Sequence, residues 1–210
     1  GWTLSRMLME YRPFVVREVE HCSDKVKIIK FRERLEGPVH TGQFVFLKVS
    51  DSDSKPFSVA ANENGLEVLV RDVGPMTGKA CRLKENDVVR VRGPYGRAFT
   101  FPADRTVVFV GAGVGIAPIH WGAMNHPGSK TVFLGARTKD ELAYRSALEK
   151  ICPVHVSTDD GSAGHEGFIH ELVEKTLAEA GLERPIFVNC GPELAMRALD
   201  RVEREHAPPE

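Results

Sequence analysis

The sequence lacks any closely spaced pair of cysteines. Its 210 residues include four, Cys22, Cys81, Cys152 and Cys190, which are 59, 71 and 38 positions apart. Without a Cys-x-x-Cys pair there is no local motif for a four-cysteine zinc site or an iron–sulfur cluster. Disulfide frameworks belong to small, cysteine-dense secreted chains. We therefore expect no metal site, free thiols and a cytoplasmic location.

Long apolar runs and an excess of either charge are also missing. No segment reaches the ~18 consecutive apolar residues that a membrane span needs. The 28 Lys and Arg residues nearly balance the 29 Asp and Glu residues, and no basic block interrupts that balance. Neither a membrane nor a nucleic acid is therefore an expected partner. With 42% hydrophobic and 27% charged residues, the composition is that of a globular protein with a real core.

The first half of the chain is patterned as short strands and turns. Its β-branched and aromatic runs cover residues 14–19, 26–31, 44–49, 66–71 and 88–92. Turn signals such as Asn64-Gly65 and Gly93-Pro94 separate them. Many short strands at near-regular spacing predict a small antiparallel barrel or sandwich.

The second half alternates strands with helices. Strands are expected at residues 106–110, 131–134, 154–157 and 185–189, and helices at 118–124, 140–149, 170–180 and 192–205. Such alternation predicts a parallel sheet with helices on both faces. We expect two domains, residues 10–103 and 104–210.

A glycine turn is the strongest local motif. Gly111, Gly113, Val114 and Gly115 follow a buried strand and begin a helix. In that setting, glycines let a phosphate approach bare backbone amides at a helix N-terminus. The spacing is GxGxG and not the GxGxxG dinucleotide fingerprint, and no acidic residue ends the next strand. The turn predicts a nucleotide site outside the ordinary NAD dehydrogenase class; a purely structural turn is the alternative.

Further segments complete a recognisable order. They are Lys55-Pro56-Phe57-Ser58, Gly74-Pro75-Met76-Thr77, Gly135-Ala136-Arg137-Thr138, Ser157-Thr158-Asp159-Asp160 and Asn189-Cys190-Gly191-Pro192. Over residues 10–205 this order resembles the ferredoxin reductase-like family of flavoproteins. The acidic segment and the glycines after it are most similar to the electron-transfer subunits of dihydroorotate dehydrogenase, an enzyme of pyrimidine biosynthesis.

The resemblance implies a fold and two cofactors. It implies a six-stranded antiparallel β-barrel that binds FAD, over residues 10–103, and an α/β parallel-sheet domain that binds NAD(H), over residues 104–210. The implied cofactor-binding residues are Lys55, Pro56, Phe57, Ser58, Gly74, Pro75, Met76, Thr77, Gly111, Gly113, Val114, Gly115, Arg137, Asp159, Asp160, Cys190, Gly191 and Pro192.

Individual roles follow from the same resemblance. The Phe57 ring would lie on the isoalloxazine and Ser58 would reach the flavin N5 region. Lys55 would face the pyrophosphate, where the family usually has Arg; lysine supplies charge without a bidentate fork. Cys190 would border the junction of nicotinamide and flavin. Ser58 and Cys190 are thus the implied catalytic positions, without a covalent role.

The choice of nucleotide would depend on two acids. Asp159 and Asp160 stand where NADP-dependent members carry a Ser-Arg pair. A carboxylate accepts hydrogen bonds from ribose hydroxyls and repels a 2′-phosphate, which favours NAD. Either acid would alternatively cap the next turn. Arg137 would pair with a nucleotide phosphate or remain solvated.

The implied activity is that of an NAD(P)H-dependent FAD oxidoreductase passing electrons to the catalytic subunit of a dihydroorotate dehydrogenase-like complex. One feature departs from the family: no cysteine follows Cys190, whereas the related subunits carry a 2Fe-2S cluster on a later segment. We expect a truncated chain or a member without the cluster. Two alternatives remain, a self-standing NAD(P)H:flavin, quinone or ferric reductase, and a non-catalytic nucleotide-binding regulator.

Overall fold

The computed structural model describes residues 10–102, 104–182 and 184–206. By its internal contacts the chain divides into two compact units, of which unit 1 ends at Phe99 and unit 2 begins at Thr100. The cofactor-binding domains with bounds at 103 and 104 remain a prediction. No helix among the described residues is both long and apolar enough to cross a bilayer.

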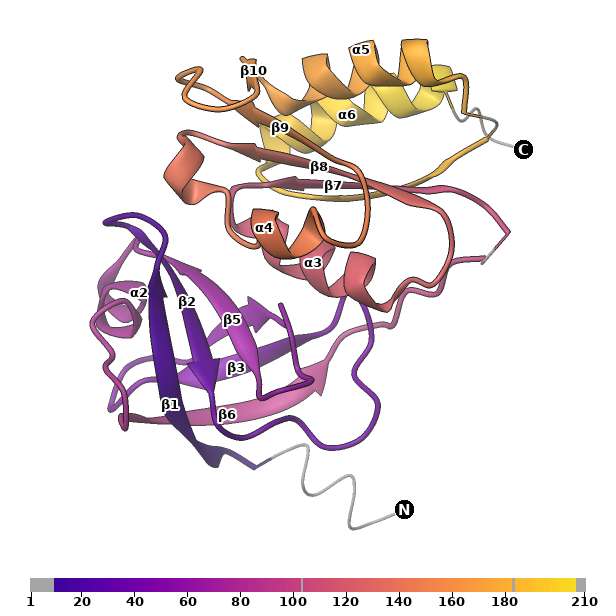
Figure 1. Cartoon of the computed structure of the whole chain (residues 1–210). Coiled ribbons are helices and arrows are strands. Elements are labelled where there is room, and N and C mark those ends of the chain that lie inside the picture. The colour runs from indigo at the N-terminus through magenta and orange to yellow at the C-terminus, as the bar shows by residue number, and fades with distance from the viewer. Residues whose placement is uncertain (1–9, 103, 183, 207–210) are drawn as a thin grey trace. The chain divides into compact units, whose positions relative to one another are not determined.

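Unit 1 is built on one antiparallel sheet (Figure 1). Its elements are β1 (Arg12–His21), β2 (Val26–Phe31), β3 (Phe44–Lys48), β4 (Lys55–Ser58), β5 (Glu67–Arg71), α2 (Pro75–Ala80) and β6 (Val88–Tyr95). The strand order is β4-β3-β6-β1-β2-β5. Alternate residues of β3 point into the core, where Val45 and Leu47 are fully buried, as expected for strands with one solvated face.

The sheet of unit 1 curls until its two edges meet. The edge strands β4 and β5 are in contact, and the chain just beyond β4 bonds to Glu67 of β5. The Ala60 N–H donates to the Glu67 carbonyl at 2.9 Å, and the Glu67 N–H donates to the Ala61 carbonyl at 2.8 Å. Closure removes part of the unpaired edge of an open sheet. The predicted antiparallel barrel is confirmed as a curled six-stranded sheet.

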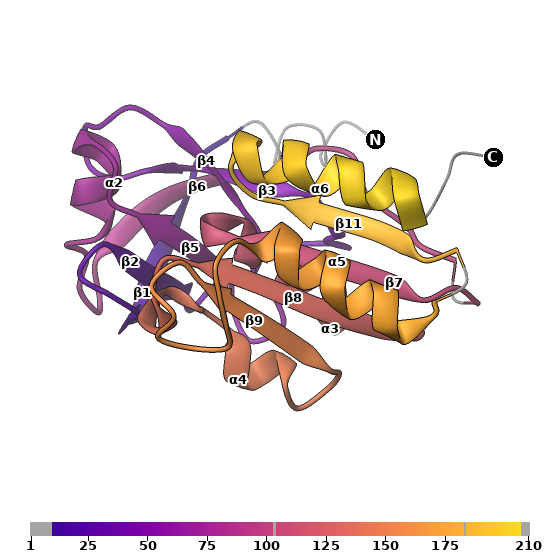
Figure 2. The same ribbon diagram turned by 90° about the horizontal axis from the view of Figure 1, so that it is seen from above.

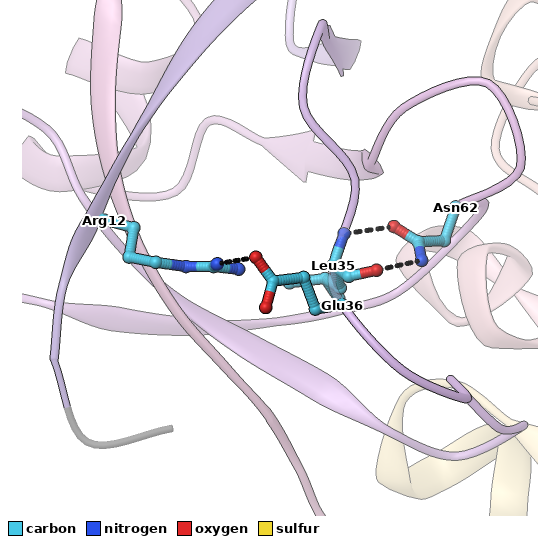
Figure 3. Close-up of polar contacts among 4 residues, drawn as sticks. All are labelled: Arg12, Leu35, Glu36 and Asn62. Carbon is cyan, nitrogen blue, oxygen red and sulfur yellow. Dashed lines mark hydrogen bonds and ion pairs between the residues drawn. The ribbon is translucent and has the colours of Figure 1, made fainter. Parts of the chain in front are cut away.

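A buried asparagine ties two loops of unit 1 together. The Asn62 carboxamide accepts a hydrogen bond from the Leu35 N–H at 2.8 Å and donates one to the Leu35 carbonyl at 3.1 Å (Figure 3). Asn62 is 8% exposed and Leu35 2%. The side chain thereby satisfies two backbone groups that no strand partner reaches. Nearby, Arg12 forms an ion pair with Glu36 at 2.6 Å on the surface (Figure 3).

Unit 2 contains an all-parallel sheet in the order β10-β9-β8-β7-β11. Its strands are β7 (Val107–Ala112), β8 (Lys130–Ala136), β9 (Val154–Thr158), β10 (His165–Glu166) and β11 (Ile186–Cys190). Its helices are η1 (Gly113–Gly115), α3 (Ile116–Asn125), η2 (Lys139–Glu141), α4 (Arg145–Leu148), α5 (Ile169–Ala180) and α6 (Glu193–His206). The predicted α/β parallel-sheet unit is confirmed.

Helices cover both faces of this sheet. In Figures 1 and 2, α5 and α6 lie on one face, and α3 and α4 on the other. Val108 and Val110 of β7 pack with Val173 of α5 and Leu199 of α6. Burial on both faces explains why β7 is apolar at every position from Val107 to Val110.

One helix prediction is wrong, and two short elements escaped prediction. The helix expected over residues 140–149 is two short pieces, η2 and α4, because Tyr144 takes a left-handed conformation with φ of 61°. The Tyr144 ring stacks on His120 of α3, with ring centroids 4.1 Å apart. The helix α2 and the strand β10, of six and two residues, were not expected from the sequence.

Candidate functional site

The carboxyl edge of the parallel sheet gathers four predicted binding segments. In register, Ala112 of β7 pairs with Gly135 of β8, Ala136 of β8 with Thr158 of β9, and Cys190 of β11 with Gly111 of β7. The loops after these strands therefore lie at one edge. The strand β7 is flanked by β8 on one side and β11 on the other. Its carboxyl end is the switch point at which open α/β sheets bind ligands.

The three glycines of the GxGxG motif, Gly111 at the end of β7 and Gly113 and Gly115 in the turn after it, meet different surroundings. A Cβ on Gly115 would lie 2.1 Å from the Cys190 carbonyl oxygen, so the turn packs backbone to backbone against the end of β11. A Cβ on Gly111 would lie 3.0 Å from Ile116 Cα. Gly113 has a φ of +57° and open space where its Cβ would stand. Gly115 thus assembles the edge, whereas Gly113 leaves bare backbone beside the exposed side chain of Val114.

Cys190 ends β11 against this turn. The thiol is half-buried, and desolvation by burial raises its pKa above the ordinary value. It is therefore a neutral thiol at pH 7 and a poor nucleophile. The next residue, Gly191, has no room for a side chain, because a Cβ would lie 2.8 Å from Ala112 Cβ. The Pro192 carbonyl accepts a bond from the Met196 N–H at 3.0 Å as α6 begins.

The two acids after β9 have unequal surroundings. The Asp160 carboxylate accepts hydrogen bonds from the N–H and the hydroxyl of Ser162, at 3.0 and 2.6 Å. These bonds, the hydroxyl's first, hold the pKa of Asp160 below its ordinary value. Asp159 is exposed, and within the described part of the chain its carboxylate has no hydrogen-bond or ion-pair partner. The turn-capping alternative therefore describes Asp160 but not Asp159.

Arg137 lies beside these acids along the sheet edge. Its carbonyl accepts a hydrogen bond from the Asp160 N–H at 3.2 Å. The guanidinium is exposed, and none of the described residues pairs with it. The structure thus brings a free cation and a free carboxylate to adjacent loops.

Phe168 is a candidate that sequence reasoning missed. It precedes α5, is 61% exposed, and stacks beside His170 with ring centroids 6.0 Å apart. Its N–H donates to Glu171 Oε2 at 3.0 Å, an N-terminal bond that lowers the pKa of Glu171. The glutamate at the third helical position supplies one half of a capping box. The Ser or Thr that completes this motif is absent at position 168, so no local sequence signal marked this aromatic side chain.

In unit 1, the predicted flavin segment forms an edge strand. Phe57 of β4 pairs with Val45 of β3, and Ser58 pairs with Phe44. Phe57 and Ser58 are half-buried, and Lys55 and Pro56 are exposed. Within the described residues, the Lys55 ammonium has no hydrogen-bond or ion-pair partner.

The second segment of unit 1 begins the helix α2. Gly74 precedes it in extended backbone, with open space where a Cβ would stand. The Thr77 hydroxyl donates to the Gly74 carbonyl and accepts from the Val73 N–H, both at 3.0 Å. Pro75 occupies the first turn, where its missing N–H costs nothing. Met76 is 5% exposed and belongs to the core. The bare backbone at Gly74 is thus the open feature here, and the Thr77 hydroxyl would have to rotate to bind an anion.

Contacts within unit 1 bring these segments close. The strand β4 contacts β5, and α2 packs on β5. Sheet closure therefore places both predicted flavin segments at the same pair of edges. Among the described residues, no group of three or more His, Cys, Asp or Glu side chains is placed to hold a metal ion.

Comparison with known proteins defines the class. No family model matches the chain. The structure of an NADH-dependent reduced ferredoxin-NADP oxidoreductase, an electron-bifurcating flavin enzyme, superposes with a TM-score of 0.80 at 26% identity, over 91% of this chain and 72% of that one. A ferredoxin-NADP+ reductase from Neisseria gonorrhoeae shares the fold at 18% identity, with a TM-score of 0.80, over 94% of this chain and 92% of its own. The protein is a member of the ferredoxin reductase-like class.

Sequence similarity narrows this class to a family. A curated protein of Thermococcus kodakarensis, named a probable dihydroorotate dehydrogenase B (NAD(+)) electron transfer subunit, is 36% identical over 195 residues, which cover 91% of this chain and 79% of the relative. The chain belongs to the family of dihydroorotate dehydrogenase B electron transfer subunits.

Proposed function

We propose that unit 1 binds FAD, that unit 2 binds NAD(H), and that the chain passes electrons from NADH to a partner redox protein. The observation that carries this proposal is the gathering of the glycine turn, the free Asp159 carboxylate and Cys190 at one sheet edge. By analogy with the named relatives, the partner is the catalytic subunit of a dihydroorotate dehydrogenase. The cytoplasmic location remains a prediction.

The carboxyl edge of unit 2 has the features that a dinucleotide requires. Open backbone at Gly113 leaves space for a diphosphate. Asp159 offers an acceptor to ribose hydroxyls, and Arg137 offers a cation to a phosphate. Phe168 presents an exposed ring on which a base would stack. The free carboxylate repels a 2′-phosphate, so we expect NADH and not NADPH as the donor.

Unit 1 offers a matching set for FAD. The bare backbone at Gly74 has room for a diphosphate, and the unpaired Lys55 supplies a positive charge. Partly exposed Phe57 supplies an aromatic face, and Ser58 a hydroxyl, on an edge strand. Pro75 and Met76 would act by shaping α2, since Met76 is buried.

The chemistry belongs to the cofactors and the positioning to the protein. Bound to unit 1, FAD would supply the capacity to take up a hydride and to release its electrons one at a time. The chain's residues need only orient the rings, exclude water and keep nucleophiles out. A neutral Cys190 thiol would meet the last requirement, because a protonated thiol is a poor nucleophile.

The visible absorption spectrum of the purified chain tests the proposal. We expect a yellow protein whose flavin band bleaches under anaerobic conditions with NADH, at least tenfold faster than with NADPH. Rapid turnover of quinone or ferric acceptors without a partner protein would favour a self-standing reductase. A colourless protein that cannot be reconstituted with FAD would refute the proposal and favour a non-catalytic nucleotide-binding regulator.

A further inference from the structure

The adjacent acids at the end of β9 differ in how much of their bonding capacity the protein already uses. Asp160 is occupied by Ser162, through two donors on one carboxylate oxygen, at 3.0 and 2.6 Å. Asp159 keeps all its acceptor sites for solvent or a ligand. Two side chains of the same type therefore offer very different chemistry to a nucleotide.

The Asp160 bonds extend to the neighbouring loop. The same Ser162 hydroxyl that donates to Asp160 accepts a hydrogen bond from the Lys139 N–H at 2.8 Å. Lys139 begins η2, just after the loop that carries Arg137. The carboxylate of Asp160 thus fixes, through Ser162, the loop after β8 to the loop after β9.

The backbone around Asp159 is held independently on both sides. The Asp159 N–H donates to the Ala136 carbonyl at 3.1 Å. The Thr158 hydroxyl donates to the Ala163 carbonyl at 2.9 Å and accepts from the Ala163 N–H at 3.0 Å. Gly164, with φ of +66°, approaches so closely that a Cβ would lie 2.1 Å from the Val156 carbonyl oxygen. These side-chain hydrogen bonds hold the loop after β9 in its conformation. Of the two acids, only Asp159 has a carboxylate that makes no hydrogen bond to the described residues.

We infer that Asp160 is a positioning residue that orders the nucleotide loop, and that Asp159 alone is the carboxylate that selects NADH over NADPH. The inference rests on the proposed function for its ligand, but the bonds of Asp160 are a property of the chain itself. Because the backbone that carries Asp159 is already ordered, only the side-chain rotamer has to be fixed when the carboxylate accepts two ribose hydroxyls.

The two roles have different chemical requirements. Asp160 accepts from neutral donors only, so an asparagine oxygen at position 160 would accept the same two bonds. Asp159 needs its charge, because hydrogen bonds to an ionised acceptor are roughly twice as strong as neutral ones and because only a charge repels a phosphate. Conservative and disruptive substitutions therefore separate the roles.

The experiment compares four variants of the full FAD-loaded chain: Asp159→Asn, Asp160→Asn, Asp160→Ala and Ser162→Ala. Steady-state kinetics with NADH and NADPH, using ferricyanide as acceptor, give KM, kcat and the preference ratio. Hydrogen exchange followed by NMR gives the protection of the Ser162 and Lys139 amides, with no cofactor chemistry involved.

We expect Asp159→Asn to lower the NADH/NADPH preference by about tenfold or more, mostly through KM, with exchange unchanged. Asp160→Asn should resemble the parent in both measurements. Asp160→Ala should expose the Ser162 and Lys139 amides to exchange and raise the NADH KM several-fold. Ser162→Ala should speed hydrogen exchange at the Lys139 amide, which loses its acceptor. The amide of residue 162 should stay protected, since the alanine N–H still donates to Asp160.

Two results would overturn the inference. Loss of NADH preference in Asp160→Asn, as large as in Asp159→Asn, would make Asp160 a ligand. Unchanged exchange in Asp160→Ala would remove its positioning role. A parent protein that neither oxidises NADH nor binds NAD+ in calorimetry would refute the proposed function instead, while the exchange data would still decide what Asp160 does.

Discussion

The two units differ in how their architecture assembles a site. In unit 2 all strands are parallel, so the loops after β7, β8, β9 and β11 reach the same edge wherever they fall in the sequence. In unit 1 neighbouring strands run in opposite directions, and the two candidate segments lie on or after opposite edge strands, β4 and β5. They become neighbours only because the sheet curls and its edges meet.

This difference determines what holds each site together. The edge of unit 2 depends on close backbone packing between loops, as at Gly115 and Cys190. In unit 1, backbone hydrogen bonds between Glu67 and the chain just beyond β4 close the curl, and Asn62, the next residue of that stretch, is held in place by its bonds to Leu35. A single added atom should therefore disable unit 2, whereas unit 1 should be sensitive to lost hydrogen bonds.

The largest effect is expected from Gly115→Ala. Its Cβ would overlap the Cys190 carbonyl, a backbone group that cannot rotate away, so the turn and the end of β11 must separate. We expect NADH turnover to fall at least 100-fold, with a lower midpoint of urea unfolding. Steady-state kinetics and urea titration measure the two effects.

Gly113→Ala is the matched control in the same turn. Its Cβ meets open space, so the cost should be the left-handed backbone alone, about 1 kcal/mol. The NADH KM should still rise, because the methyl group occupies the space left for the diphosphate. Equal unfolding midpoints for the two variants would contradict the packing role of Gly115.

In unit 1, Asn62→Ala should cost about 2–4 kcal/mol of unfolding free energy, because it leaves the buried Leu35 N–H and carbonyl without partners. Arg12→Ala, in the same view (Figure 3), breaks a surface ion pair and a cation–π contact with Phe14, 5.9 Å from the ring centroid. Because the arginine side chain is partly exposed to solvent in both contacts, the variant should cost at most about 1 kcal/mol. Urea unfolding with and without FAD measures both variants. A small loss from Asn62→Ala would show that the curl does not depend on this tie.

The same contrast explains what the sequence could reveal. Continuous apolar runs such as residues 107–110 imply burial on both faces and hence a parallel sheet, whose geometry then predicts that the glycine turn and Cys190 meet. Nothing comparable in residues 55–58 and 74–77 predicts that those segments become neighbours, because curling depends on the whole sheet. Only the family resemblance connected them.

The roles of residues that depend on individual side-chain contacts could not be predicted from the sequence. Asp159 and Asp160 are identical side chains in adjacent positions, and only the Ser162 bonds distinguish them. The interruption of the expected helix at Tyr144 is equally non-local. It accompanies stacking on His120, 24 positions earlier in the sequence.

A smaller effect is expected on the pH dependence of stability, to which His126 should make unit 2 sensitive. His126 of unit 2 is 4% exposed and lies beside the rings of Phe101 and Phe109. Desolvation first, and Lys130 second, lower its pKa below 6.5. Below pH 6.5 the unfolded chain therefore binds a proton that the folded chain does not, and stability falls with falling pH. Urea unfolding at pH 7.5 and 5.5 should show this loss in the parent, and His126→Phe should reduce it. An equal loss in the variant would assign the acid sensitivity to other groups.

The smallest effect is expected from Lys55→Arg on the edge strand of unit 1. The lysine has only a point charge to offer a diphosphate, whereas arginine would add a bidentate fork. Because the side chain is exposed and screened by solvent, we expect FAD to bind only about threefold more tightly, well under 1 kcal/mol. Flavin fluorescence titration of the apoprotein measures the change, and Lys55→Ala should shift it in the opposite direction. The NADH KM should stay constant in both variants, because the diphosphate that Lys55 would meet is that of FAD. Unchanged FAD affinity in both variants would mean that the backbone at Gly74 holds the flavin diphosphate without help from β4.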